Sequence, residues 1–248
     1  MRTRSLPPRP GPRNLAPSGS GSAAGLLELR LDAGRDGAPL SLLLLGAHAD
    51  DIEIGCGGTL LRLAEAGVPV RATWVVLSAS GARREEAVAS AAAFLPGVEL
   101  DVRIGEFRDA FFPHDPGVKE FVEALKHDVA PDIILTHTRN DLHQDHRVVC
   151  ELAWNAFRDH LVLEYEVPKY DGDLGAPNVF VPLREEQVRK KARLLLEHFG
   201  SQRNKHWFAE DLFVSLARLR GVECRSPSGY AEGFYGRKVR VALPLPAC

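Results

Sequence analysis

The feature that most constrains the fold is a regular alternation of short apolar runs and amphipathic segments between residues 40 and 159. The apolar runs have the length of buried strands, and the segments between them carry apolar residues at helical spacing. Strands that alternate with helices in this way pair in parallel, because each helix crosses over one face of the sheet. The pattern therefore predicts an α/β fold, with a doubly wound, mostly parallel, Rossmann-like sheet flanked by helices.

Four strand–helix units account for most of this alternation. The strands are expected at residues 40–45, 70–77, 98–105 and 131–137, and the helices at 55–67, 82–95, 118–130 and 145–159. Beyond residue 160 the pattern is looser. We expect a strand at 161–168 and helices at 184–199 and 201–221, in the same domain or as a cap on it.

Composition and charge exclude several classes of function. Apolar residues make up 45% of the chain and charged residues 26%, which is typical of globular proteins. A formal net charge of −2 provides no electrostatic basis for binding nucleic acid or an anionic membrane. No apolar run approaches the roughly 20 residues of a membrane-spanning helix. We expect neither nucleic acid nor a membrane as a partner.

The two ends of the domain can also be placed. Residues 1–26 are rich in Pro, Gly, Ser and Arg, so we expect a disordered extension there and a single domain over residues 27–248. The extension lacks the apolar stretch of a secretion signal, which favours a cytoplasmic location. The cysteines show no paired spacing and are expected to be free, mostly buried thiols: Cys56, Cys150, Cys224 and Cys248.

Two polar clusters, residues 46–51 and 140–146, follow the first and fourth expected strands. In open parallel sheets, functional residues gather beyond the carboxyl ends of the strands. A catalytic zinc site uses three protein ligands and leaves the fourth position to water. His48, Asp51 and His146 would supply such a set for one Zn²⁺ per chain, lowering the pKa of the bound water toward about 7.

Neighbouring residues provide the remaining chemistry. Asp50 is expected to face the water as general base, since adjacent residues on a tight turn diverge. His143 precedes His146 by three residues, which suits a hydrogen bond to the developing oxyanion. Asp145 is expected to orient His143 and to tune its pKa. Each cluster alone is better explained by a helix start or a solvated turn, but their coincidence at two strand ends favours a metal site.

The two clusters resemble the motifs of a known family. GAHADDIEIGCGGTL is similar to the AHPDDE signature of the PIG-L/LmbE-type N-acetylglucosaminyl deacetylases, and NDLHQDHR is similar to that family's HxDH motif. The resemblance extends from about residue 40 to at least residue 202. It implies an LmbE-like fold and zinc-dependent deacetylation of an N-acetylated amino sugar or its conjugate. It also implies roles for five residues: ligands at His48, Asp51 and His146, the base at Asp50 and the oxyanion donor at His143.

Some positions depart from the family pattern or match it less specifically. Ala49 replaces the usual Pro, and Ile52 stands where an acidic residue is usual. Arg83 and Asp109 match positions implied to bind substrate, with Asp109 contacting sugar hydroxyls. Their simpler explanations are a solvated charge on a helix and a turn residue.

Several other functions would also use parts of these motifs. A related zinc amidase would cleave a non-acetyl amide at the same site. A metallo-β-lactamase fold is disfavoured, because the HxDH motif follows four strand–helix units. A non-catalytic, receiver-like domain binding magnesium would leave His48 without a role. An inactive, sugar-binding homologue is disfavoured because all five inferred site residues are present. The identity of the small-molecule amino sugar is not specified by the sequence.

Overall fold

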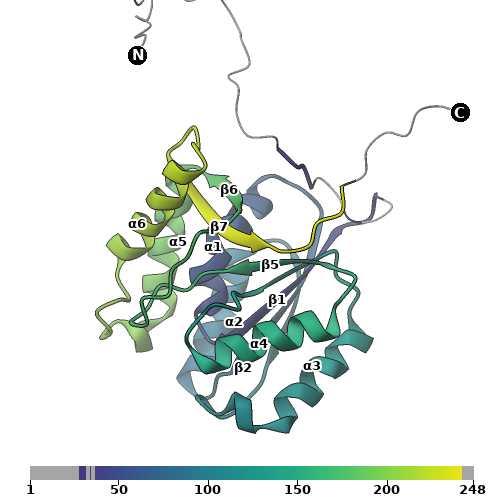
Figure 1. Ribbon diagram of the computed structural model, residues 1–248. Coiled ribbons are helices and arrows are strands. Elements are labelled where there is room, and N and C mark those ends of the chain that lie inside the picture. Colours follow the sequence, from purple (N-terminus) through teal and green to yellow (C-terminus); the bar gives the residue numbers. More distant parts are fainter. Residues whose placement is uncertain (1–27, 32–33, 35–36, 242–248) are drawn as a thin grey trace, which may run out of the picture.

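The structure is a computed structural model that describes residues 28–31, 34 and 37–241 (Figure 1). The extension expected over residues 1–26 lies outside the described residues, as does Cys248. The expected α/β fold is confirmed, since a mostly parallel sheet lies between layers of helices.

One seven-stranded sheet organises the chain. β3, β2, β1, β4 and β5 lie side by side in parallel, and β7 and β6 continue the sheet in antiparallel pairing. The strands are β1 Leu40–His48, β2 Val70–Ser78, β3 Glu99–Ile104, β4 Ile133–His137, β5 Leu161–Tyr165, β6 Val179–Leu183 and β7 Tyr230–Gly236. The strand order reverses between β1 and β4, where an open parallel sheet forms a crevice at its carboxyl edge.

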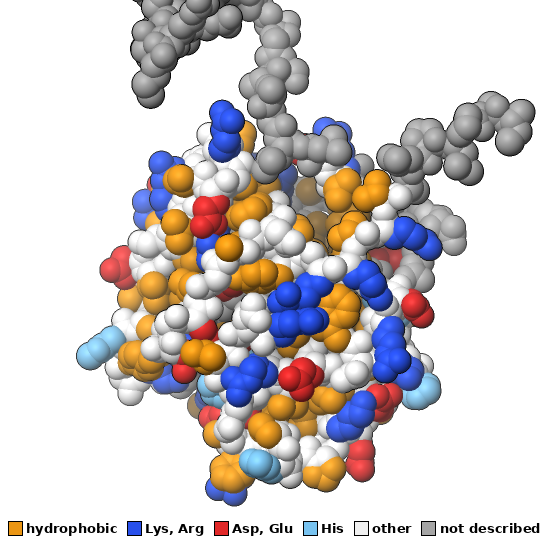
Figure 2. Space-filling view, viewed as in Figure 1, with side chains coloured by type: hydrophobic (Ala, Val, Ile, Leu, Met, Phe, Trp, Pro, Cys, Tyr) orange, Lys and Arg blue, Asp and Glu red, His pale blue; other side chains and the backbone are white. Residues whose placement is uncertain are grey.

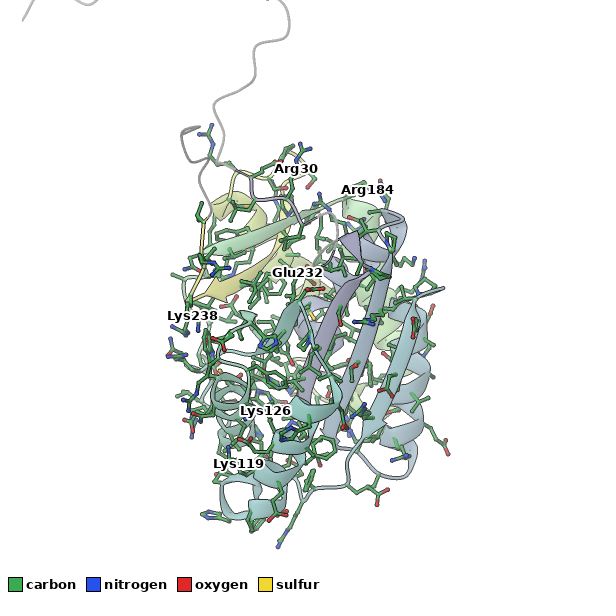
Figure 3. The ribbon with its side chains drawn as sticks, turned by 90° about the vertical axis from the view of Figure 1, so that its right-hand side faces the viewer. Arg30, Lys119, Lys126, Arg184, Glu232 and Lys238 are labelled. Carbon is green, nitrogen blue, oxygen red and sulfur yellow. The ribbon has the colours of Figure 1, made fainter. Side chains whose placement is uncertain are left out.

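The central strand β1 is buried on both faces. Its successive side chains point to opposite sides of the sheet, and helices cover both sides. The helices are α1 Asp51–Glu65, α2 Ala82–Phe94, α3 Pro116–Asp128, α4 Gln144–Ala156, α5 Glu185–His198 and α6 Glu210–Glu223. Leu42 and Leu44 pack with residues of α1, α2 and α5, whereas Leu43 and Leu45 pack with α3 and α4. Figure 3 shows helices on either side of the strands.

Helix α1 packs unusually close to the sheet. It begins at Asp51, four residues before the helix start expected at residue 55, so Gly55 lies within the helix. A Cβ atom added to Gly55 would lie 2.1 Å from Cδ2 of Tyr165 in β5. Only glycine permits this approach, which brings the start of α1 against the middle of the sheet.

The C-terminal third differs most from expectation. The helix expected at residues 201–221 forms only over Glu210–Glu223, and β6 and β7 were not expected. Because β7 pairs with both β5 and β6, this region extends the same sheet and is not a separate cap. β6 contains Pro182, which is tolerated because β6 is an edge strand.

The exterior carries mixed charge. Figure 2 shows acidic and basic side chains interspersed with apolar ones over the face viewed. Among the helices of the described residues, none has both the length and the apolar character needed to cross a membrane. Both observations agree with the composition of the chain.

Candidate metal centre

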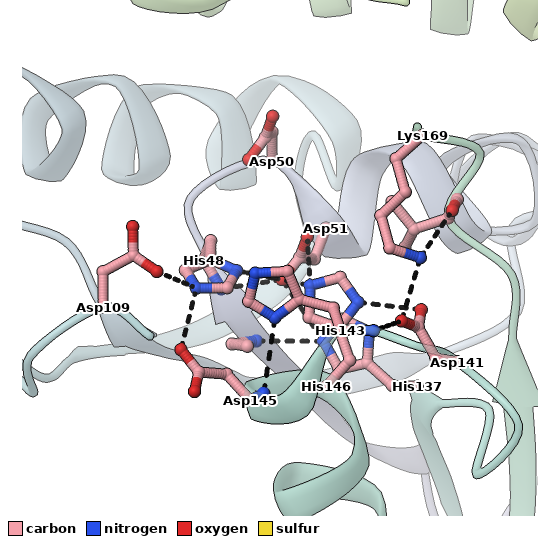
Figure 4. Close-up of polar contacts among 12 residues, drawn as sticks. His48, Asp50, Asp51, Asp109, His137, Asp141, His143, Asp145, His146 and Lys169 are labelled. Carbon is pink, nitrogen blue, oxygen red and sulfur yellow. Dashed lines mark hydrogen bonds and ion pairs between the residues drawn. The ribbon is translucent and has the colours of Figure 1, made fainter. Parts of the chain in front are cut away.

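The two polar clusters meet at the carboxyl edge of the sheet, in the crevice between β1 and β4. His48 is the last residue of β1, Asp51 is the first residue of α1, and His146 lies in the first turn of α4. All three are buried, with exposed fractions of 8%, 4% and 2%. Figure 4 shows their side chains directed toward one another. The juxtaposition expected from the topology is therefore present in the structure.

Nitrogen and oxygen atoms of these three residues converge. Nδ1 of His48 lies 3.3 Å from Nε2 of His146 and 3.4 Å from Oδ2 of Asp51. Oδ1 of Asp51 lies 3.5 Å from Nε2 of His146. One ligand atom from each residue lies within 4.8 Å of the other two, which is close enough for all three to bind one ion.

The outer nitrogen of each histidine contacts a carboxylate. Nδ1 of His146 lies 2.8 Å from Oδ2 of Asp141, and Nε2 of His48 lies 2.9 Å from Oδ1 of Asp109. Each carboxylate accepts a hydrogen bond from the N–H of the outer nitrogen, which leaves the lone pair of the ring on the inner nitrogen. Two such lone pairs beside the carboxylate of Asp51 form an electron-rich donor set, which suits a divalent ion such as Zn²⁺.

The charges of the centre follow from burial and these contacts. Burial is the main cause that lowers the pKa of His146 to about 4, so this ring is neutral near pH 7. Burial alone would lower the pKa of His48, but hydrogen bonds to carboxylates, first that of Asp109, hold it well above its usual value. Burial would raise the pKa of Asp51, but its interactions with neighbouring histidines, first His146 and then His137, hold it well below its usual range. A metal ion bound by His48 would displace the extra proton of that ring.

Asp50 adjoins a ligand but has different contacts. It accepts a hydrogen bond of 2.9 Å from Nη2 of Arg83, and its side chain is 5% exposed. It occupies the N-cap position of α1 without a side-chain capping bond, so a helix cap does not explain the Asp50–Asp51 pair. Burial and the charge of Asp51 raise the pKa of Asp50 to about 7, although Arg83 opposes the shift. Such a carboxyl group can exchange a proton near neutral pH.

His143 lies beside His146, as expected from their spacing. The two rings stack with centroids 4.5 Å apart, and the ring of His143 is 5.0 Å from that of His48. The backbone N–H of Asp145 donates to Nδ1 of His143 at 3.3 Å, so the neutral ring carries its proton on Nε2. Burial and the charge of His48 lower the pKa of His143. The ring is thus a neutral hydrogen-bond donor at the rim of the centre.

Asp145 lies beside His143 and, as expected, acts on its pKa: its charge raises that pKa against the lowering by burial and by His48, while its hydrogen bonds go to a neighbouring loop. Its carboxylate accepts hydrogen bonds from the backbone N–H groups of Ala110, at 2.6 Å, and Phe112, at 3.2 Å. Oδ2 of Asp145 also lies 3.4 Å from Nε2 of His48. Asp145 therefore holds the loop between β3 and α3.

The two residues expected to bind substrate both reach the centre. Asp109 bonds His48, yet its side chain remains 61% exposed. This hydrogen bond lowers the pKa of Asp109 to about 2, so the group is a carboxylate. Arg83 is partly exposed beside Asp50. Glu86, which accompanies Arg83 in the sequence, instead accepts hydrogen bonds from the backbone N–H and hydroxyl of Ser201.

Three residues of this region were missed at the level of sequence: His137, Asp141 and Lys169. His137 ends β4, its ring stacks on His146 with centroids 3.9 Å apart, and its Nε2 lies 3.2 Å from Oδ2 of Asp51. The rule that points to strand ends would have identified it. Asp141 stands within the second motif, whereas Lys169 lies in a later loop that carries no comparable signal.

Comparison with known proteins identifies the family. The model of the PIG-L family, described as GlcNAc-PI de-N-acetylase, matches residues 43–157. YaiS of Escherichia coli K12, described as an uncharacterized deacetylase, is 30% identical over 168 residues, which cover 63% of this chain and 89% of YaiS. This chain belongs to the PIG-L family. The matched segment includes every residue of the centre from His48 to His146, so the protein is a member of a deacetylase family with a candidate metal site.

Solved structures show that the PIG-L chain has a widely used fold. N,N'-diacetylchitobiose deacetylase of Pyrococcus horikoshii is 20% identical with a TM-score of 0.59, over 78% of this chain and 82% of that one. GalB, the 4-carboxy-2-hydroxymuconate hydratase of Pseudomonas putida KT2440, is 22% identical with a TM-score of 0.66, over 83% and 99%. These likenesses establish the fold alone, because one fold supports different reactions and the residues of the site determine which one occurs.

Proposed function

We propose that this protein hydrolyses the acetamide of an N-acetylated amino sugar, or of a conjugate of one, to acetate and a free amine. The observation that carries the proposal is the convergence of His48, Asp51 and His146, with a carboxylate behind each histidine. Two imidazoles and one carboxylate are a usual ligand set of catalytic zinc, and we propose one Zn²⁺ per chain. Membership of the PIG-L family supports the acetamido substrate.

The residues around the ligands would carry out the proton transfers and stabilise the developing negative charge. The ion, when bound, supplies Lewis acidity and makes water a nucleophile near neutral pH. Asp50 accepts the proton that water loses on attacking the amide carbonyl, and returns it to the leaving nitrogen. The C–N bond breaks, the hydroxyl stays on the acetyl carbon and the proton completes the amine. His143 donates a hydrogen bond from Nε2 to the carbonyl oxygen as that oxygen becomes negative.

Asp109 and Arg83 take different roles beside the centre. The exposed carboxylate of Asp109 lies over the centre and can accept hydrogen bonds from sugar hydroxyl groups. Arg83 holds the carboxylate of Asp50 and remains partly exposed beside it. The proposal is therefore that Asp109 contacts the sugar while Arg83 orients the base.

Metal content and acetate release, measured on one preparation, test the proposal. The panel contains N-acetylglucosamine, a nucleotide sugar of it, diacetylchitobiose and N-succinylglucosamine, with the Asp50→Asn variant controlling for contaminating deacetylases. We expect one zinc per chain and zinc-dependent acetate release from at least one sugar. Hydrolysis confined to the succinyl amide would instead identify a related zinc amidase. A folded preparation that binds no metal and releases no acetate would overturn the proposal.

A further inference from the structure

A lysine outside both sequence motifs lies behind the candidate metal centre. Lys169 belongs to the connection between β5 and β6, and its Nζ lies 2.9 Å from Oδ1 of Asp141. Oδ2 of the same carboxylate lies 2.8 Å from Nδ1 of His146 (Figure 4). We propose that Lys169 is a positioning residue that sets, through Asp141, the orientation and tautomer of the metal ligand His146.

The burial of this group distinguishes it from a surface ion pair. The side chain of Lys169 is 9% exposed, and those of its partners Asp141 and Asp173 are 2% and 6% exposed. Nζ of Lys169 lies 2.8 Å from Oδ2 of Asp173. An enclosed ammonium group is costly unless it is hydrogen-bonded to carboxylates, so this arrangement is specific.

The contacts of Asp141 show how Lys169 reaches the ligand. Oδ1 of Asp141 accepts a hydrogen bond of 2.8 Å from the backbone N–H of His143 in addition to the contact with Lys169. With Oδ1 held by two donors, Oδ2 is directed at the ring of His146. This arrangement keeps the ring proton on Nδ1 and the lone pair of Nε2 toward His48.

Lys169 also supplies charge that the other hydrogen-bond partners of the Asp141 carboxylate lack. The N–H groups of a neutral His146 ring and of the His143 backbone are uncharged donors. A buried carboxylate bonded only to uncharged groups is poorly compensated, and its hold on the ring weakens. The ammonium group of Lys169 provides a positive charge in direct contact with this carboxylate, whereas Arg147 contacts only the backbone carbonyl of Asp141.

Asp173 extends this arrangement to the neighbouring loop. Its Oδ2 accepts a hydrogen bond of 2.7 Å from the backbone N–H of Leu142, the residue before His143. Lys169 and Asp173 thus join the β5–β6 connection to the loop that carries His143. A purely structural clamp would make the same contacts, so the test must report on the metal ligand separately from stability.

The test compares Zn²⁺ affinities by chelator competition, and it rests on the proposed function because His146 is taken as a ligand. Lys169→Met is expected to bind Zn²⁺ about 10–100-fold more weakly than the wild type. Lys169→Arg, which keeps a cation, is expected to recover most of that loss. Lys191→Met is the matched control, because Lys191 is 8% exposed and pairs at 2.6 Å with Glu232, the interior residue labelled in Figure 3.

The control separates positioning from general destabilisation. Lys191→Met is expected to lower the melting temperature while keeping the wild-type Zn²⁺ affinity. Wild-type affinity in a folded Lys169→Met variant would overturn the inference, as would an equal loss in Lys191→Met. If Lys169→Met does not fold, the Zn²⁺ affinities of Lys169→Gln and Lys169→Arg provide the same comparison. A wild-type protein that binds no zinc contradicts the proposed function first, which distinguishes the two failures.

Discussion

Oδ2 of Asp145 lies 2.6 Å from the backbone nitrogen of Ala110, so the first turn of α4 holds the loop that carries Asp109. Ala110 has a φ of 65°, a left-handed conformation that is uncommon for a residue other than glycine. The strained residue and its acceptor together place Asp109 on His48. Backbone strain of this kind persists where the surrounding contacts enforce it.

Asp145→Ala removes the acceptor of two backbone N–H groups, those of Ala110 and Phe112. We expect the free energy of unfolding to fall by about 1–3 kcal/mol, the cost of leaving buried donors unpaired. Hydrogen exchange should accelerate at residues 110–112. Asp128→Ala, which breaks an ion pair with Arg103 at the surface, should cost no more than about 1 kcal/mol. Unchanged hydrogen exchange at these residues in the Asp145 variant would show that Asp145 does not hold the loop between β3 and α3.

Asp50→Asn keeps the shape of the side chain but cannot accept a proton. We expect zinc content to stay at the wild-type level while kcat falls at least about 10²-fold, the usual share of a general base. Asp101→Asn, at a side chain 55% exposed on β3, should leave kcat unchanged. Full activity of the Asp50 variant would show that another group is the base.

His146→Ala removes one of the three converging donors. We expect the purified variant to lose its zinc, because a site with two protein ligands binds the ion weakly. His114→Ala, in the short helix at Phe112–His114, is a histidine control that should keep one zinc per chain. Metal content measured by mass spectrometry decides this, and stoichiometric zinc in the His146 variant would disprove the ligand set.

The dependence of stability on pH should reflect Glu164. Burial would raise the pKa of Glu164, but hydrogen bonds, first those from Arg237 at 2.7 and 2.8 Å, lower it below its usual value. A depressed folded pKa stabilises the protein above the unfolded pKa of about 4.3 and ceases to do so as pH falls through the folded value. Urea unfolding from pH 7 to pH 3 should therefore show a weaker pH dependence in Glu164→Gln than in the wild type. The exposed Glu120→Gln should keep the wild-type slope, and equal slopes for all three proteins would refute the assignment.

Gly55→Ala tests the close approach of α1 to the sheet. The added Cβ would lie 2.1 Å from Tyr165, whose hydroxyl donates to the carbonyl oxygen of Leu45 at 2.7 Å. We expect the free energy of unfolding to fall by about 1–3 kcal/mol, as for other overpacked cores. Gly200→Ala, where the nearest atom is 3.7 Å away, should be tolerated. A Gly55 variant as stable as the wild type would show that α1 can move freely.

The first four strands and their parallel pairing could be predicted because their signals are local. Each is a short apolar run followed by a helix, and the parallel pairing follows from that alternation. β6 and β7 could not be predicted in the same way. β6 contains Pro182, which argues against a central strand, and only its place at the sheet edge makes that proline acceptable.

The sequence by itself determined that His48, Asp51 and His146 stand at the ends of neighbouring strands, because chain order and topology set those positions. It did not determine which carboxylate serves which histidine, since that depends on side-chain direction in three dimensions. Only the tertiary structure brought the carboxylate of Asp145 into hydrogen-bond contact with the β3–α3 loop, and that of Asp141 into contact with His146. Lys169 is separated from Asp141 by a strand and a helix along the chain, so its contact with that carboxylate is a product of the fold alone.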